Sequence, residues 1–159
     1  MRAVTMRSMH RRPKEFPYSV VEYRSYYGCK LDLITTPTRE QFKLDKKNKA
    51  DIGSLMAKVT KDAGFGLRHI KVVHFKVGEG VTVAQILAES LADMHTYPER
   101  DGCAQVWLDY CNWQQDNSEK AWAWWFGVES LLEPQAIGLG KKFYVPVLSS
   151  REQLLRDRK

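Results

Sequence analysis

His95 and Cys103 are the residues of this sequence whose chemistry best suits catalysis, because an imidazole can accept the proton of a neighbouring thiol. They lie on either side of a turn at Pro98, so they could meet in space. Asp93 or Asp109 could orient the base. One hypothesis is therefore a small hydrolase or transferase with its site at this turn. Buried structural thiols are more common than catalytic ones, so this enzyme is the alternative hypothesis and a non-catalytic protein is the main one.

The sequence predicts neither a metal site nor a cofactor. His69 and His74 stand five residues apart in a predicted strand, so they point to opposite faces about 16 Å apart. The cysteines are odd in number and form no CxxC pair, which disfavours a zinc ribbon and a disulfide framework. These cysteines are Cys29, Cys103 and Cys111.

Positive charge is concentrated in the first half of the chain. The net charge is +6 overall, and residues 1–79 carry 17 Lys/Arg against 8 Asp/Glu. A field of this sign attracts phosphate polymers, and the tyrosines between the cations could stack on unpaired bases. We therefore expect RNA or an acidic protein surface as partner. The expected contacts are Arg7, Arg11, Arg12, Lys14, Arg24, Lys30, Lys43, Lys46, Lys47, Lys49, Arg68 and Lys71.

The N-terminal residues 1–14 contain five basic residues and no acidic one. This composition is typical of a mitochondrial presequence and equally of a basic arm that lies on nucleic acid. No apolar run is long enough for a secretory signal or a membrane-spanning helix. The main hypothesis is a non-catalytic subunit of an organellar ribonucleoprotein or complex, located in mitochondria or otherwise in the cytoplasm.

All five tryptophans lie between positions 107 and 125, and most belong to a predicted helix at 117–132. Apolar residues occupy nearly every direction of this helix, which indicates a core helix, or a core helix that also docks on a protein. The expected protein interface, with other subunits of the assembly, consists of Trp122, Trp124, Trp125 and Phe126. A second alternative is a phage-type inhibitor that binds one host protein through this helix.

Periodicity and turn signals predict an α+β fold with a single mixed β-sheet of about four to five strands, covered by three helices. A basic arm (1–16) precedes one domain (17–149), and a charged helix or tail (150–159) follows it. A capping box of Thr82 and Gln85 predicts that residues 82–95 form one of the helices. The predicted strands are 18–24, 30–35, 67–77, 103–111 and 142–148, and the other predicted helices are 50–63 and 117–132.

Overall fold

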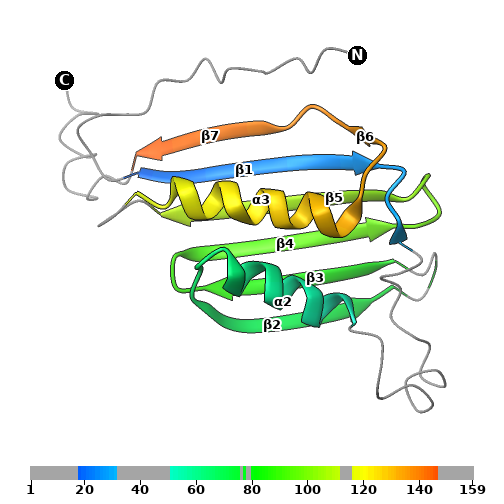
Figure 1. Cartoon of the computed structure of the whole chain (residues 1–159), viewed down its shortest axis with the longest axis horizontal. Coiled ribbons are helices and arrows are strands. Elements are labelled where there is room, and N and C mark those ends of the chain that lie inside the picture. The colour runs from blue at the N-terminus through cyan, green and yellow to red at the C-terminus, as the bar shows by residue number, and fades with distance from the viewer. Residues whose placement is uncertain (1–17, 32–50, 76, 78–79, 112–115, 147–159) are drawn as a thin grey trace, which may run out of the picture.

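A seven-stranded antiparallel sheet forms the body of the protein (Figure 1). The computed structural model describes residues 18–31, 51–75, 77, 80–111 and 116–146. The strand order is β2-β3-β4-β5-β1-β6, and β7 also pairs with β1. The elements in chain order are β1 (Tyr18–Tyr27), α2 (Ile52–Asp62), β2 (Leu67–His74), β3 (Val81–Leu87), β4 (Ser90–Tyr97), β5 (Cys103–Cys111), α3 (Ser118–Leu132), β6 (Ala136–Ile137) and β7 (Lys141–Pro146).

Both helices lie on the same face of the sheet, which we call the covered face (Figure 1). Buried and more exposed side chains therefore alternate along the strands. In β3, Val81, Val83 and Leu87 are buried under the helices. The intervening side chains, such as Thr82 and Ile86, point to the other face, which we call the open face. The described residues place no helix over the open face (Figure 1).

A buried hydrogen-bond chain links the two helices to the sheet. The indole Nε1 of Trp124 in α3 donates to Thr60 Oγ1 in α2 at 3.0 Å. The Thr60 hydroxyl donates in turn to Gln85 Oε1 of β3 at 2.8 Å. The helices also approach each other closely, because a Cβ at Gly127 would lie 2.8 Å from Val59. The indole N–H, the hydroxyl and the amide oxygen are thereby paired, whereas the Gln85 Nε2 is buried without a partner among the described residues.

The predicted helix at 82–95 is wrong, since these residues form the β3–β4 hairpin. Its apolar residues fit a helical stripe, but they also alternate with period two on both sides of the turn at Ala88-Glu89. Thr82 caps nothing, and its hydroxyl instead contacts His95 on the neighbouring strand. The alternation decided the structure because it buries Val83 and Met94 against the helices.

The predicted sheet was also too small. The sheet has seven strands, all antiparallel rather than mixed, and the described residues contain two helices rather than three. Residues 18–27 form one continuous strand that ends at Gly28, whose φ of +62° terminates it. The predicted helices at 50–63 and 117–132 and the predicted strands at 103–111 and 142–148 match α2, α3, β5 and β7 closely. The arm at 1–16 and the tail at 150–159 lie outside the described residues.

Neither α2 nor α3, the helices in the described part of the chain, is long and apolar enough to cross a membrane.

Candidate functional site

Polar and aromatic side chains gather at the centre of the open face. Strand register places Thr82 opposite His95, and Asp93 opposite Trp107. Trp107 lies in turn opposite Tyr23 of β1. Side chains directly opposite each other on one face of an antiparallel sheet are neighbours. We call these five residues, which come from four adjacent strands, the open-face cluster.

The imidazole of His95 is held from one side. Its Nδ1 lies 2.8 Å from Thr82 Oγ1, within hydrogen-bond distance. Its Nε2 lies 3.9 Å from Asp93 Oδ1, which is an ion-pair distance but too long for a hydrogen bond. The ring is oriented by Thr82 and is partly exposed, so it can contact a group on the open face.

Asp93 is the electrostatically least satisfied member of the cluster. Its Oδ1 is buried and accepts no hydrogen bond within the described part of the chain. Burial raises the pKa of Asp93, and the nearby His95 only partly opposes that shift. A carboxylate in this state would gain free energy from a cation placed beside it.

The aromatic members of the cluster are stacked. The rings of Tyr23 and Trp107 lie 4.7 Å apart between centroids, at 29°. The Trp107 side chain is nevertheless 38% exposed, a high value for so large a residue in a central strand. An exposed indole next to a carboxylate is a combination that favours a cationic ligand.

The β3–β4 hairpin closes through a strained turn, and the first residue after it, Ser90, lies opposite Leu87 and Tyr110, which are both buried on the covered face. Ser90 therefore belongs to the covered face. Leu87 pairs with Ser90, so only Ala88 and Glu89 form the connection. Ser90 adopts a φ of +154°, a region that residues with a side chain rarely occupy. Strain of this kind persists only where neighbouring contacts impose it, and it is concentrated at functional sites.

Contacts from two other segments hold this turn in place. The Ala88 N–H donates to the Gly66 carbonyl at 2.7 Å, and the Gly66 N–H donates to Glu89 Oε2 at 3.0 Å. Lys120 of α3 lies 3.2 Å from Glu89 Oε1. Burial by itself would raise the pKa of Glu89, but the Gly66 N–H and Lys120 outweigh it and lower this pKa. The Glu89 carboxylate is therefore fixed and ionised immediately before the strained Ser90.

The structure does not bring His95 and Cys103 together as predicted. Cys103 is opposite Tyr97, whereas His95 is opposite Gln105, and the ring nitrogens of His95 contact Thr82 and Asp93. Burial raises the pKa of the Cys103 thiol, with a weaker opposing effect from Arg100, so this thiol is a poor nucleophile. The prediction that Asp93 accompanies His95 agrees with the 3.9 Å distance.

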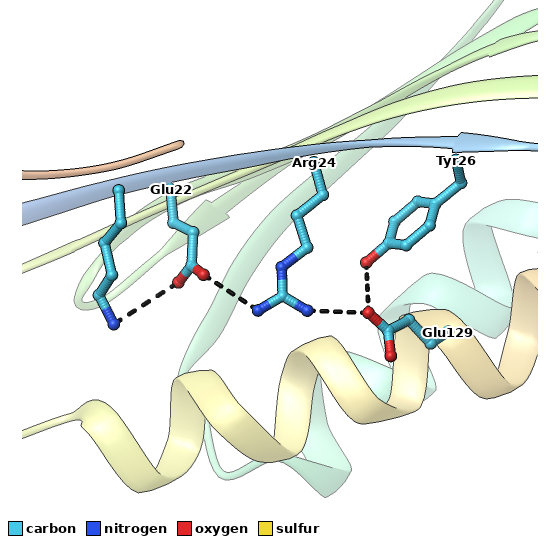
Figure 2. Close-up of polar contacts among 5 residues, drawn as sticks. Glu22, Arg24, Tyr26 and Glu129 are labelled. Carbon is cyan, nitrogen blue, oxygen red and sulfur yellow. Dashed lines mark hydrogen bonds and ion pairs between the residues drawn. The ribbon is translucent and has the colours of Figure 1, made fainter. Parts of the chain in front are cut away.

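Arg24, one of the predicted contacts to an acidic partner, is engaged inside the protein (Figure 2). Its guanidinium lies 3.0 Å from Glu22 Oε1 and 2.8 Å from Glu129 Oε1 of α3, and it stacks on the Trp125 ring. The Tyr26 hydroxyl donates to the same Glu129 oxygen at 2.9 Å. Burial, opposed by the Arg24 charge, raises the pKa of Tyr26. This network joins β1 to α3, so Arg24 is not available to a phosphate.

The other predicted cations do not converge in the part of the chain that the structure describes. Lys30 forms an ion pair with Glu133. Arg68 and Lys71 are exposed on the edge strand β2, far along the sheet order from β1. The remaining predicted contacts lie outside the described residues; they are Arg7, Arg11, Arg12, Lys14, Lys43, Lys46, Lys47 and Lys49.

The predicted tryptophan interface divides into two kinds of residue. Trp124 and Trp125 are buried in the core, so they cannot contact another protein. Trp122 and Phe126 are 73% and 63% exposed, and their rings stack on each other on the outer side of α3. The structure therefore leaves only these two as interface candidates.

Within the described ranges, no group of three or more His, Cys, Asp or Glu residues could hold a metal ion.

The sequence prediction missed Glu89 and Ser90, because it placed both inside a helix. The sequence carries only a partial signal, since Val81, Thr82 and Val83 alternate but Ala84, Ile86 and Leu87 break the alternation. The strict alternation of buried and exposed residues in 81–87 becomes visible only in the structure. The Asp93–Trp107 neighbourhood was missed for the same reason, since it depends on the register between β4 and β5.

Comparison with solved structures supports this fold. An adenosylmethionine decarboxylase from Aquifex aeolicus VF5 superposes with a TM-score of 0.64 at 21% identity, covering 85% of this chain and 96% of that chain. At this identity the match concerns the fold alone. No curated protein sequence matches this chain.

The model of one protein family matches residues 40–126, which is more than half of the chain. The matched segment contains the β3–β4 hairpin and every member of the open-face cluster except Tyr23. The family is one of enzymes, so the predicted non-catalytic subunit of a ribonucleoprotein or mitochondrial complex is wrong. The chain belongs to the S-adenosylmethionine decarboxylase family.

Proposed function

We propose that this protein catalyses the decarboxylation of S-adenosylmethionine. In this reaction the bond between the α-carbon and the carboxylate breaks, CO2 leaves, and a proton takes its place on the α-carbon. The family match supports the proposal, because it spans the strained hairpin and most of the open-face cluster. The observation that carries it is the position of Ser90: a serine in a strained conformation, directly after a fixed carboxylate.

Decarboxylation leaves an electron pair on the α-carbon, so the enzyme needs an electron-withdrawing group. We infer that Ser90 provides it, converted into a pyruvoyl group at a new chain terminus. Such a group would supply a carbonyl able to hold the amino group of the substrate and to accept the electron pair released with CO2. Ser90 fits this role, since its hydroxyl can be lost and its φ of +154° strains the backbone where the chain would break.

The conversion balances without an external oxidant. Ser90 Oγ attacks the Glu89 carbonyl carbon, the Glu89–Ser90 peptide bond breaks, and an ester replaces it. Loss of the Ser90 α-proton then expels Glu89 as a carboxylate and leaves a carbon–carbon double bond. This enamine takes up a proton at its β-carbon and becomes an imine, and one water molecule hydrolyses the imine and releases ammonia. The products are a chain that ends at Glu89 and a chain that begins at residue 90.

The neighbouring residues support this chemistry by position. Gly66 and Lys120 hold the Glu89 side chain, so the peptide bond that breaks cannot relax by rotating away. His95 lies five residues from Ser90 on the same strand, about 16 Å away, so it cannot take the proton of Ser90 within one chain. The same distance keeps His95 from an α-carbon held at residue 90, so we assign His95, whose ring Thr82 fixes, to a contact with another part of the substrate.

The experiment is release of CO2 from S-adenosylmethionine labelled in its carboxylate. We expect release by the wild-type protein and none above background by Ser90→Ala. Ser54→Ala is the matched control, because Ser54 is an exposed serine of α2 and should leave the rate unchanged. Wild-type protein that releases no label, or Ser90→Ala that equals the Ser54→Ala control, contradicts the proposal.

A further inference from the structure

We propose that Lys120 is a positioning residue for the cleavage of the Glu89–Ser90 peptide bond, so that cleavage becomes efficient only when α3 has docked on the sheet. The inference rests on the proposed function and concerns how cleavage at that same site is controlled. It is carried by the contacts of the Glu89 carboxylate, by the position of Lys120 in its helix and by the charge that cleavage creates.

Three segments of the chain meet at the Glu89 carboxylate. Its Oε2 accepts a hydrogen bond from the Gly66 N–H at 3.0 Å, and its Oε1 lies 3.2 Å from Lys120 Nζ. Gly66 precedes Glu89 by 23 residues, and Lys120 follows it by 31. Both oxygens of this carboxylate therefore acquire these partners only when the loop before β2 and the first turn of α3 lie against the hairpin.

The loop before β2 also fixes the place of the Lys120 ammonium. This loop approaches the hairpin closely, because a Cβ at Gly66 would lie 2.9 Å from the Cβ of Ala88. The Lys120 Nζ lies 5.9 Å from the centre of the buried Phe65 ring of the same loop. The side chains of Glu89 and Lys120 are only 14% and 29% exposed, so salt screens their attraction less than that of a surface pair.

The position of Lys120 in α3 does not stabilise the helix itself. The helix begins at Ser118, so Lys120 lies in its first turn. A cation there is unfavourable, because the N-terminal end of a helix carries a partial positive charge. What this position provides is the ion pair with Glu89, which joins the helix to the residue that donates the carbonyl of the cleaved bond.

Cleavage changes the charge that Lys120 faces. The intact chain has one carboxylate at residue 89, whereas the cleaved chain has two, because the main-chain carbonyl of Glu89 becomes a C-terminal carboxylate. Two negative groups on one partly buried residue repel each other, and this cost begins to act as the ester breaks. Lys120 is the basic side chain that the described part of the chain places on Glu89, so it is positioned to offset the new charge.

The test follows cleavage of the full chain during cell-free synthesis, with a pulse of labelled methionine and separation of the fragments by gel electrophoresis. We expect Lys120→Met to slow the conversion of the intact chain into two fragments by about 10- to 10²-fold, because a hydrogen bond between charged groups is lost. Lys120→Arg keeps the charge and should recover part of the rate. Lys58→Met is the matched control, since Lys58 is an exposed lysine of α2 that pairs with Asp62, and it should cleave at the wild-type rate.

A second measurement separates positioning from a merely structural role. If Lys120 acts through the Glu89 carboxylate, its loss should have no further effect once that carboxylate is gone. The double variant of Glu89→Gln and Lys120→Met should therefore cleave as fast as Glu89→Gln alone. If Lys120→Met lacks the circular dichroism of the folded protein, Lys120→Gln replaces it in the same comparisons.

Three results overturn the inference: additive losses in the double variant, cleavage of Lys120→Met at the rate of Lys58→Met, or Lys120→Arg no faster than Lys120→Met. The proposed function fails in a different way. A wild-type chain that stays intact contradicts the proposed function and the inference with it, whereas a cleaved wild type with any of the three results contradicts the inference alone.

Discussion

The two faces of the sheet use the same kinds of residue for different purposes. On the covered face, the charged groups Arg24 and Glu129 pair with each other and Thr60 pairs with Gln85. The orphaned buried atoms of that face, such as Gln85 Nε2 and Trp125 Nε1, carry no charge. On the open face, His95 and Asp93 are only partly enclosed, and Asp93 lacks a hydrogen bond on one oxygen. Residue type alone therefore does not reveal function in this protein. What distinguishes a structural charge from a functional one is whether the fold has already supplied its partner.

The largest effect on activity should come from the open face. His95→Asn should reduce kcat/KM for S-adenosylmethionine by about 10- to 10²-fold, because it removes a positioned hydrogen bond to the substrate. His69→Asn is the control, since His69 is exposed on the edge strand β2. Equal rates of CO2 release from the two variants would remove His95 from the reaction and weaken the contrast between the faces.

The covered face should dominate stability instead. Trp124→Ala should lower the free energy of unfolding by about 3–5 kcal/mol, because it opens a cavity and leaves Thr60 without the indole donor. Trp122→Ala, on the exposed side of the same helix, should cost less than about 1 kcal/mol. Urea titrations of both variants measure this difference, and similar midpoints would mean that α3 does not pack as described.

A smaller effect is expected from the ion network of Figure 2. Arg24→Met should destabilise the protein by about 1–3 kcal/mol, since Glu129 would lose its cation and Glu22 would keep only Lys142, at 3.8 Å. The value stays below that of a fully buried pair because solvent reaches about a quarter of Arg24. Adding Glu22→Gln and Glu129→Gln should restore much of the loss. If the triple variant is as unstable as Arg24→Met, packing on Trp125 rather than charge explains the loss.

The smallest effect should come from the pH dependence of Asp93. Its pKa is raised in the folded state, so the folded protein binds this proton more tightly than the unfolded chain does. The carboxylate therefore costs stability once the pH exceeds its folded pKa, and it costs nothing below the pKa of the unfolded chain. Asp93→Asn should be more stable than wild type at pH 7, by about 1 kcal/mol or less, and indistinguishable at low pH. A variant less stable than wild type at pH 7 would show that Asp93 has a partner in the folded state.

Much of the architecture follows from local patterns in the sequence. The helix at Ile52–Asp62 was predictable because its apolar residues recur with helical spacing, and β5 was predictable from its alternation. The segment from Thr82 to His95 was not, because its apolar residues satisfy both periods. Only pairing with β5 and burial under the helices select the hairpin, and these are tertiary effects.

The site was less predictable than the fold. His95 and Asp93 were singled out from their chemistry, and the structure does bring them near each other. Cys103 was assigned as partner from closeness in sequence, whereas the true neighbours of His95 are set by register across two strand pairs. Arg24 looked like a surface cation because the sequence does not show that Glu129 lies above it. The strain at Ser90 is a backbone property that no composition argument reveals.

The central claim, that the reaction centre is the strained peptide bond between Glu89 and Ser90, is tested most directly by the mass of the purified protein. The account predicts two fragments, residues 1–89 ending in a carboxylate and residues 90–159 beginning with a pyruvoyl group, whose masses sum to that of the intact chain plus water minus ammonia. It also predicts that Ser90→Ala remains a single chain. A wild-type protein that stays intact and still decarboxylates S-adenosylmethionine would contradict the account.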